Sequence, residues 1–150
     1  MKAKDIMTTD VLTVSLNTSV KKLAKFFIDY DISGAPVVDE HEKIIGIVTE
    51  SDLIFQKKKL HLPTVLTLFE GVFFLENTKN TEKELKKIIG STVEDIYSKD
   101  VITLEEETEV EEIATIMIEK KVHVLPVLKG EELVGIVGKA DIVKGLARGL

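Results

Sequence analysis

One sequence pattern occurs twice in the chain, and this duplication constrains its fold more than any other feature. Asp-Ile at 5–6, Asp-Val at 10–11 and Pro-Val at 36–37 return 90 positions later in the 150-residue sequence. Gly-Ile-Val at 46–48 and Asp52 return 89 positions later, as 135–137 and Asp141, so one residue has been dropped between them. Two copies of a small unit usually pack about a pseudo-twofold axis. We therefore expect any clefts at that axis to form a related pair.

Composition limits what such a repeat can be. Hydrophobic residues make up 44% of the chain and charged residues 31%, as in a folded domain with a packed core. A net charge of −6 argues against a nucleic-acid partner, because affinity for phosphates depends on clustered cations. The chain has no cysteine, and its first residues contain no apolar signal segment, so we expect a cytoplasmic protein. The longest apolar stretch, 60–75, is interrupted by polar residues and is too short for a membrane span.

The first copy predicts a strand, a helix, a two-stranded hairpin and a second helix. The strand covers 11–14, and the polar residues 17–19 can cap the helix that follows. A proline opens the hairpin at 36, a polar turn covers 39–43, and an apolar strand covers 44–48. One apolar stripe runs along the first helix at helical spacing: Val20, Leu23, Ala24, Phe27 and Ile28.

The second copy predicts the same elements: strands over 101–104, 125–128 and 133–137, and helices over 110–119 and 139–147. We place the first repeat at 1–54, an insertion at 55–92 and the second repeat at 93–150. Within the insertion, 81–90 is typical of a short helix that ends at a glycine. Its apolar segment 60–75 forms either a lid with its own core or an interface for a partner.

A Thr-x-x-Asp sequence opens the predicted helix after the first hairpin. Unpaired N–H groups at a helix start suit phosphate, and a carboxylate can accept from both hydroxyls of a ribose. Thr49 and Asp52 could therefore bind a nucleotide. The same two residues also fit a capping box, which needs no ligand. One residue can serve both purposes.

The duplicated order resembles the cystathionine-β-synthase (CBS) domain pair, also called a Bateman module. The motifs that carry the resemblance are Asp-Ile-Met-Thr at 5–8, Ser-Gly-Ala-Pro-Val-Val-Asp at 33–39 and Gly-Ile-Val-Thr-Glu-Ser-Asp at 46–52. It covers 4–54 and 93–147 and implies an α+β fold of tandem β-α-β-β-α repeats related by a pseudo-twofold axis, with an extra helical insertion. It also implies a stand-alone, non-catalytic regulatory protein that binds AMP, ADP, ATP or S-adenosylmethionine in clefts between the repeats.

The resemblance further implies that each cleft combines residues of both repeats. The cleft expected to bind more strongly is lined by Thr49, Glu50, Ser51, Asp52, Tyr97, Ile102, Val122, His123 and Val124. The weaker cleft is lined by Met7, Leu12, Ile32, Ser33, Gly34, Lys139, Ala140 and Asp141.

The two clefts should differ because Gly138 stands where the first repeat has Thr49. The second cleft lacks the hydroxyl expected to reach phosphate, although Lys139 supplies a charge nearby. We expect it to bind weakly, to prefer a ligand with less phosphate, or to stay empty. His123 has an alternative interpretation as a hydrogen-bonded histidine at the edge of the core.

The sequence also bears on two other functions, an enzyme and a scaffold. The three histidines lack metal-ligand spacing, and the chain has no nucleophile motif. We therefore expect neither an enzyme nor a metal site. A dimeric scaffold with vestigial clefts, contacting its partner through 60–75, is the alternative to a ligand sensor. By resemblance we expect a homodimer, and the regulated target must be a separate polypeptide.

Overall fold

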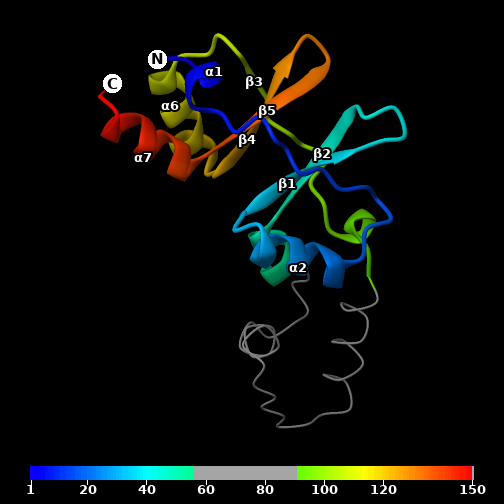
Figure 1. Cartoon of the computed structure of the whole chain (residues 1–150). Helices are drawn as coiled ribbons and strands as arrows, with labels where there is room; N and C mark the ends of the chain where they lie inside the picture. The colour runs from blue at the N-terminus through cyan, green and yellow to red at the C-terminus, as the bar shows by residue number, and fades with distance from the viewer. Residues whose placement is uncertain (56–90, 150) are drawn as a thin grey trace, which may run out of the picture.

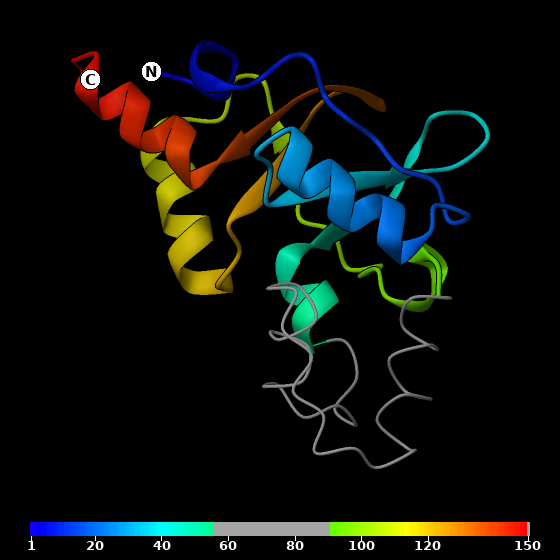
Figure 2. The same ribbon diagram turned by 60° about the horizontal axis from the view of Figure 1, so that its bottom comes forward.

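The computed structural model describes residues 1–55 and 91–149, which form two α+β lobes (Figure 1). The predicted helix over 81–90 and the apolar segment 60–75 lie outside the described residues. In Figure 1, α6 (Val110–Lys120) and α7 (Lys139–Ala147) lie at the left and α2 (Val20–Asp29) lies below, while the two hairpin turns extend to the upper right; Figure 2 shows α2 in front of the strands of the first hairpin.

The first lobe contains α2 (Val20–Asp29), β1 (Gly34–Val38), β2 (Ile44–Thr49) and α3 (Glu50–Phe55). Ser19 caps α2, since its side chain accepts a hydrogen bond from the backbone N–H of Lys22 at 3.1 Å. β1 and β2 pair as the predicted antiparallel hairpin, with Pro36 opposite Ile47. The strand predicted over 11–14 is wrong in extent, because only Val14 forms a bridge, parallel to Val37.

The second lobe repeats this arrangement with a three-stranded sheet in the order β3-β4-β5. Its strands are β3 (Leu104–Glu105), β4 (Val124–Lys129) and β5 (Glu132–Gly138), and its main helices are α6 (Val110–Lys120) and α7 (Lys139–Ala147). β4 and β5 are antiparallel, with Pro126 opposite Ile136, while β3 is parallel to β4. The strand predicted over 101–104 is shorter in the structure, because β3 begins only at the last residue of that range.

Each repeat begins by packing on the other lobe. α1 (Ala3–Ile6) buries Ala3 in the core of the second lobe, and Thr8 bridges Ile136 of β5. The equivalent 3-10 turn η1 (Val93–Asp95) buries Val93 in the core of the first lobe, and Ser98 bridges Ile47 of β2. Figure 1 shows the blue N-terminal turn beside α7 and the green segment after 91 beside the first repeat. The two repeats thus exchange their first segments.

The cores follow the helical stripes, with one exception. Val20, Leu23 and Phe27 of α2 are buried, as are Val110, Ile113 and Met117 at the equivalent positions of α6. Ile28 was predicted to belong to the apolar stripe, and this is wrong, because its side chain is 74% exposed. It lies in the last turn of α2, at the edge of the stripe, where no other element of the described residues covers it.

Candidate functional site

The two repeat-ending helices, α3 and α7, begin with the same carboxylate cap. Asp52 Oδ2 accepts from the backbone N–H of Thr49 at 2.8 Å and from its hydroxyl at 3.3 Å. Asp141 Oδ2 accepts from the backbone N–H of Gly138 at 2.7 Å. The capping interpretation of Thr-x-x-Asp is therefore confirmed in the first repeat, and Asp141 makes the same carboxylate cap in the second repeat without the threonine. The cap uses Oδ2 of each aspartate, and Oδ1 has no hydrogen-bond partner within residues 1–55 and 91–149.

Asp52 lies in a partly buried position at the start of α3. Burial raises the pKa of the Asp52 carboxyl above its ordinary value of 3.8, and the hydrogen bonds from Thr49 oppose this rise. A buried carboxylate gains more from a hydroxyl donor than an exposed one does, because the surrounding dielectric is lower. The Asp52 environment therefore favours a ligand that can donate to the carboxylate.

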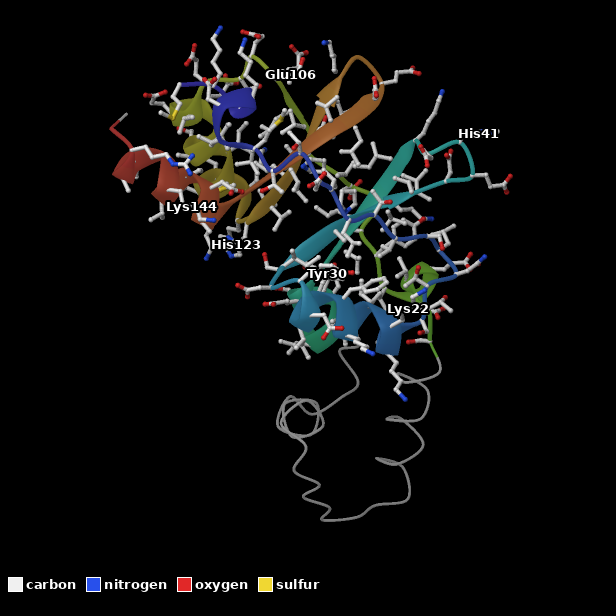
Figure 3. The ribbon with its side chains drawn as sticks, viewed as in Figure 1. Lys22, Tyr30, His41, Glu106, His123 and Lys144 are labelled. Carbon is white, nitrogen blue, oxygen red and sulfur yellow. The ribbon has the colours of Figure 1, made fainter. Side chains whose placement is uncertain are left out.

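A cavity of about 510 Å³ lies at the start of α7, between the lobes. Its volume falls within the ~300–1,000 Å³ typical of small-molecule sites. Figure 3 labels three of its lining residues, His123 and Lys144 from the second repeat and Tyr30 from the first. The second repeat contributes His123, Val124, Ile136, Gly138, Lys139, Ala140, Asp141 and Lys144, and the first contributes Thr8, Asp10, Val11, Leu12, Tyr30, Asp31, Ile32, Ser33 and Gly34.

The cavity brings together all the residues assigned to the second cleft except Met7. Met7 packs instead against Gly135, where an added Cβ would meet the Met7 side chain. His123 and Val124, assigned to the first cleft, line this cavity as well. Val124 reaches it from the junction of the lobes, where a Cβ on Gly34 would lie 3.3 Å from Val124 Cγ2.

The remaining residues of the first cleft are more dispersed. Thr49, Glu50, Ser51 and Asp52 lie together at the start of α3, while Tyr97 covers Gly46 on the neighbouring strand. Ile102 and Val122 pack at the edge of the second core. Neither of the two cavities described for residues 1–55 and 91–149 is lined by Thr49 or Asp52.

Backbone hydrogen bonds hold each pre-strand segment beside a helix start. The N–H of Glu50 donates to the carbonyl of Ser33 at 3.0 Å, and the N–H of Lys139 donates to the carbonyl of His123 at 3.2 Å. These two bonds are equivalent in the two repeats. They explain why the residues before each buried proline and the residues that open each helix contribute to the same part of the surface.

Several lining residues were not predicted from the sequence. Lys144 lies three positions after Asp141 on α7, so helical periodicity could have identified it. Tyr30 and Asp31 directly precede the predicted Ile32. Asp31 adopts a left-handed φ of 51° that ends α2, and Lys121 has a φ of 54° at the equivalent place. The sequence does not indicate this left-handed conformation, because neither Asp31 nor Lys121 is a glycine.

A second cavity, of about 500 Å³, lies between the two hairpin turns. Lys43 of the first turn forms an ion pair with Glu131 of the second at 3.2 Å. Thr9, Val11 and Thr13 form the wall nearest the first cavity.

Within residues 1–55 and 91–149 no group of three or more histidine or acidic side chains is arranged to hold a metal ion. In the same part of the chain, no helix has the length and apolar character to cross a bilayer.

Two α+β repeats that exchange their first segments and enclose a cleft at the helix starts define a tandem-repeat module. The chain belongs to the CBS domain family, whose family model matches residues 3–59 and 93–148. It is 31% identical over 144 residues to inosine-5'-monophosphate dehydrogenase of Methanocaldococcus jannaschii, covering 95% of this chain but only 23% of that enzyme. It is 30% identical to CBS domain-containing protein CBSX1, chloroplastic, of Arabidopsis thaliana, of which it spans 58%.

Solved structures agree with this family. The CBS domain pair of protein MJ0100, in complex with 5'-methylthioadenosine and S-adenosyl-L-methionine, has a TM-score of 0.72 and 26% identity, with coverage of 100% of this chain and 98% of that one. CBSX2 in complex with AMP has a TM-score of 0.70 at 24% identity, with coverage of 99% and 97%, which shows the shared fold alone. The predicted α+β fold of paired CBS repeats is confirmed.

Proposed function

We propose that this chain is a non-catalytic regulatory module that binds an adenosine-containing ligand between its repeats and acts on a separate protein. The observation that carries the proposal is the cavity at the start of α7, which both repeats line. A ligand there would contact both lobes and could change how they sit together. The MJ0100 domain pair, similar over the whole chain, binds two adenosine compounds.

The chemistry of the lining fits such a ligand. Leu12, Ile32 and Val124 offer apolar contacts for a flat base. Asp141 Oδ1 can accept from ribose hydroxyls while Oδ2 caps α7. Lys139 and Lys144 can contact an anionic group at the other end of the ligand.

A second ligand position is proposed at Thr49 and Asp52. Here a hydroxyl stands beside the carboxylate, whereas Gly138 has no side chain to offer. We propose that phosphate-bearing ligands prefer the Asp52 position and that ligands with less phosphate prefer the Asp141 cavity. To donate to phosphate, the Thr49 hydroxyl would give up its long 3.3 Å hydrogen bond to Asp52 Oδ2. A hydroxyl donor to phosphate is worth about 1 kcal/mol, or about fivefold in affinity, and the loss of that bond reduces this gain.

Isothermal titration of AMP, ATP and S-adenosylmethionine into the wild type, Asp52→Ala and Asp141→Ala tests both statements. The two variants are matched controls, since each removes one helix cap. We expect binding to the wild type, a larger loss of AMP and ATP affinity in Asp52→Ala, and a smaller loss in Asp141→Ala. Equal losses would refute the preference for one position. If no adenosine compound binds the wild type, the sensor function is refuted in favour of a scaffold that contacts its partner through 60–75.

A further inference from the structure

The cavity at the start of α7 has walls of opposite charge. Its first-repeat wall carries the carboxylates of Asp10 and Asp31 and no cationic side chain. Its second-repeat wall carries the ammonium groups of Lys139 and Lys144. The third carboxylate of the lining belongs to Asp141, which also caps α7. A ligand in this cavity therefore meets negative charge on one side and positive charge on the other.

The charged groups of these two walls are not paired with each other. The ion pairs formed by residues 1–55 and 91–149 involve none of Asp10, Asp31, Lys139 and Lys144. Within the same residues, none of these four side chains forms a hydrogen bond. Opposite charges that line one cavity without pairing are available to a ligand that carries both signs.

An aromatic ring accompanies the carboxylates of the first-repeat wall. Tyr30 lines the cavity directly before Asp31, and its ring packs edge to face on Phe26 with the ring centres 6.1 Å apart. This contact fixes the place of the ring. A ring beside a carboxylate attracts a cation, because the ring face and the carboxylate are both negative. Figure 3 shows Tyr30 on the first repeat and Lys144 on the second.

The second repeat has lysines where the first has Tyr30 and Asp31. Lys120 and Lys121 stand 90 positions later, and Lys121 shares the left-handed backbone of Asp31, with a φ of 54° against 51°. The start of the following helix changes in the reverse sense, since Lys139 of α7 corresponds to Glu50 of α3. The two repeats therefore share a backbone at these positions but carry opposite charges on it.

We propose that Tyr30 and Asp31 select the ligand of this cavity by the charge of its tail, so that an adenosine compound with an amino-acid tail binds in preference to one with an uncharged or a phosphate tail. This inference rests on the proposed adenosine site. The ammonium and carboxylate groups of such a tail are attached to one carbon atom and point apart. The ammonium group can then reach Asp31 while the carboxylate reaches Lys139 or Lys144. A polyphosphate tail would meet the same lysines but would also bring negative charge toward Asp10 and Asp31.

Isothermal titration of three adenosine compounds separates this selection from adenosine binding itself. The tail is uncharged in 5'-methylthioadenosine, an amino acid in S-adenosylhomocysteine, and a polyphosphate in ATP. We expect the wild type to bind S-adenosylhomocysteine about tenfold more tightly than 5'-methylthioadenosine. Asp31→Asn removes the charge, and asparagine tolerates the left-handed backbone, so folding should be preserved. Its affinity for S-adenosylhomocysteine should fall about tenfold, while its affinity for 5'-methylthioadenosine should stay within about threefold.

Two further variants sharpen the test. Asp29→Asn makes the same change in net charge outside the cavity lining and should leave both affinities within about twofold. Asp31→Lys introduces the residue that the second repeat has here, and it should weaken S-adenosylhomocysteine further while strengthening ATP by about threefold. Equal affinities of the wild type for S-adenosylhomocysteine and 5'-methylthioadenosine, or an equal loss of both in Asp31→Asn, would overturn the selection and leave the adenosine site intact. If none of the three compounds binds the wild type, the proposed function fails and this inference fails with it.

Discussion

Gly46 and Gly135 occupy equivalent positions in the two hairpins, yet substitution by alanine should affect them unequally. A Cβ on Gly46 would overlap the backbone carbonyl oxygen of Ser98 and the ring of Tyr97. A Cβ on Gly135 would overlap only the side chain of Met7. A methionine side chain can move to another rotamer, whereas a bridged backbone cannot move without breaking its hydrogen bonds. Ser98 is held by two such bonds to Ile47, of 2.9 and 3.0 Å.

The size of each effect follows from this difference. Overpacking against fixed atoms costs about 1–3 kcal/mol, so we expect about 3 kcal/mol for Gly46→Ala. Gly135→Ala should cost about 1 kcal/mol, because the flexible Met7 can give way. At about 2–4 °C per kcal/mol for a chain of this size, the unfolding midpoints should fall by roughly 6–12 °C and 2–4 °C.

Thermal unfolding by differential scanning calorimetry measures both shifts. Gly138→Ala is the control, since a Cβ there would lie 3.7 Å from its nearest neighbours, an ordinary contact distance. Its midpoint should change by less than about 2 °C. If Gly135→Ala costs as much as Gly46→Ala, the difference between a fixed backbone and a movable side chain does not govern these junctions. The reasoning would then be refuted.

Three further predictions concern charge and capping. Two lysines lower the pKa of Glu107 from 4.5 to about 2, so its contribution to stability is present above pH 4.5 and fades toward pH 2; the difference in unfolding free energy between the wild type and Glu107→Gln should shrink over that range. The pKa of Asp52 is raised, so ionisation of this carboxyl destabilises the folded wild type as pH rises above 3.8. The ligand-free Asp52→Asn variant should therefore gain unfolding free energy relative to the wild type over that range, and a constant difference would contradict this. Ser19→Ala should lower the unfolding free energy by about 1 kcal/mol in denaturant titration, because its side chain caps α2. Glu109→Ala should have little effect, since Glu109 makes no side-chain cap at the equivalent place.

The duplication in the sequence predicted the two hairpins and all four main helices of the described residues. Strong periodic patterns and a buried proline in each repeat mark these elements. Short strands were harder to predict, because Val14 and Leu104 pair with one neighbouring strand only and depend on tertiary contacts. Local propensity over 11–14 could not show that most of the segment stays unpaired.

The exchange of the first segments between lobes could not be predicted. Since α1 and η1 occupy equivalent positions, a duplicated sequence fits equally well whether each turn packs on its own repeat or on the other. Ala3 and Val93 are small apolar residues in either case. The arrangement is decided by the bridges of Thr8 and Ser98 to the opposite hairpins and by the burial of Ala3 and Val93 in the opposite cores.

This exchange connects the cavity at the start of α7 to the rest of the module. After crossing from the second lobe, residues 8–13 run between the two cavities, and their side chains alternate. Thr8, Asp10 and Leu12 line the cavity at α7, Thr9 and Thr13 line the cavity between the hairpin turns, and Val11 lines both. If residues 8–13 can adopt two conformations, a ligand that binds one of them more tightly shifts the equilibrium between them by that difference in affinity. Because the same backbone forms a wall of the second cavity, we expect such a shift also to change the space between the hairpin turns.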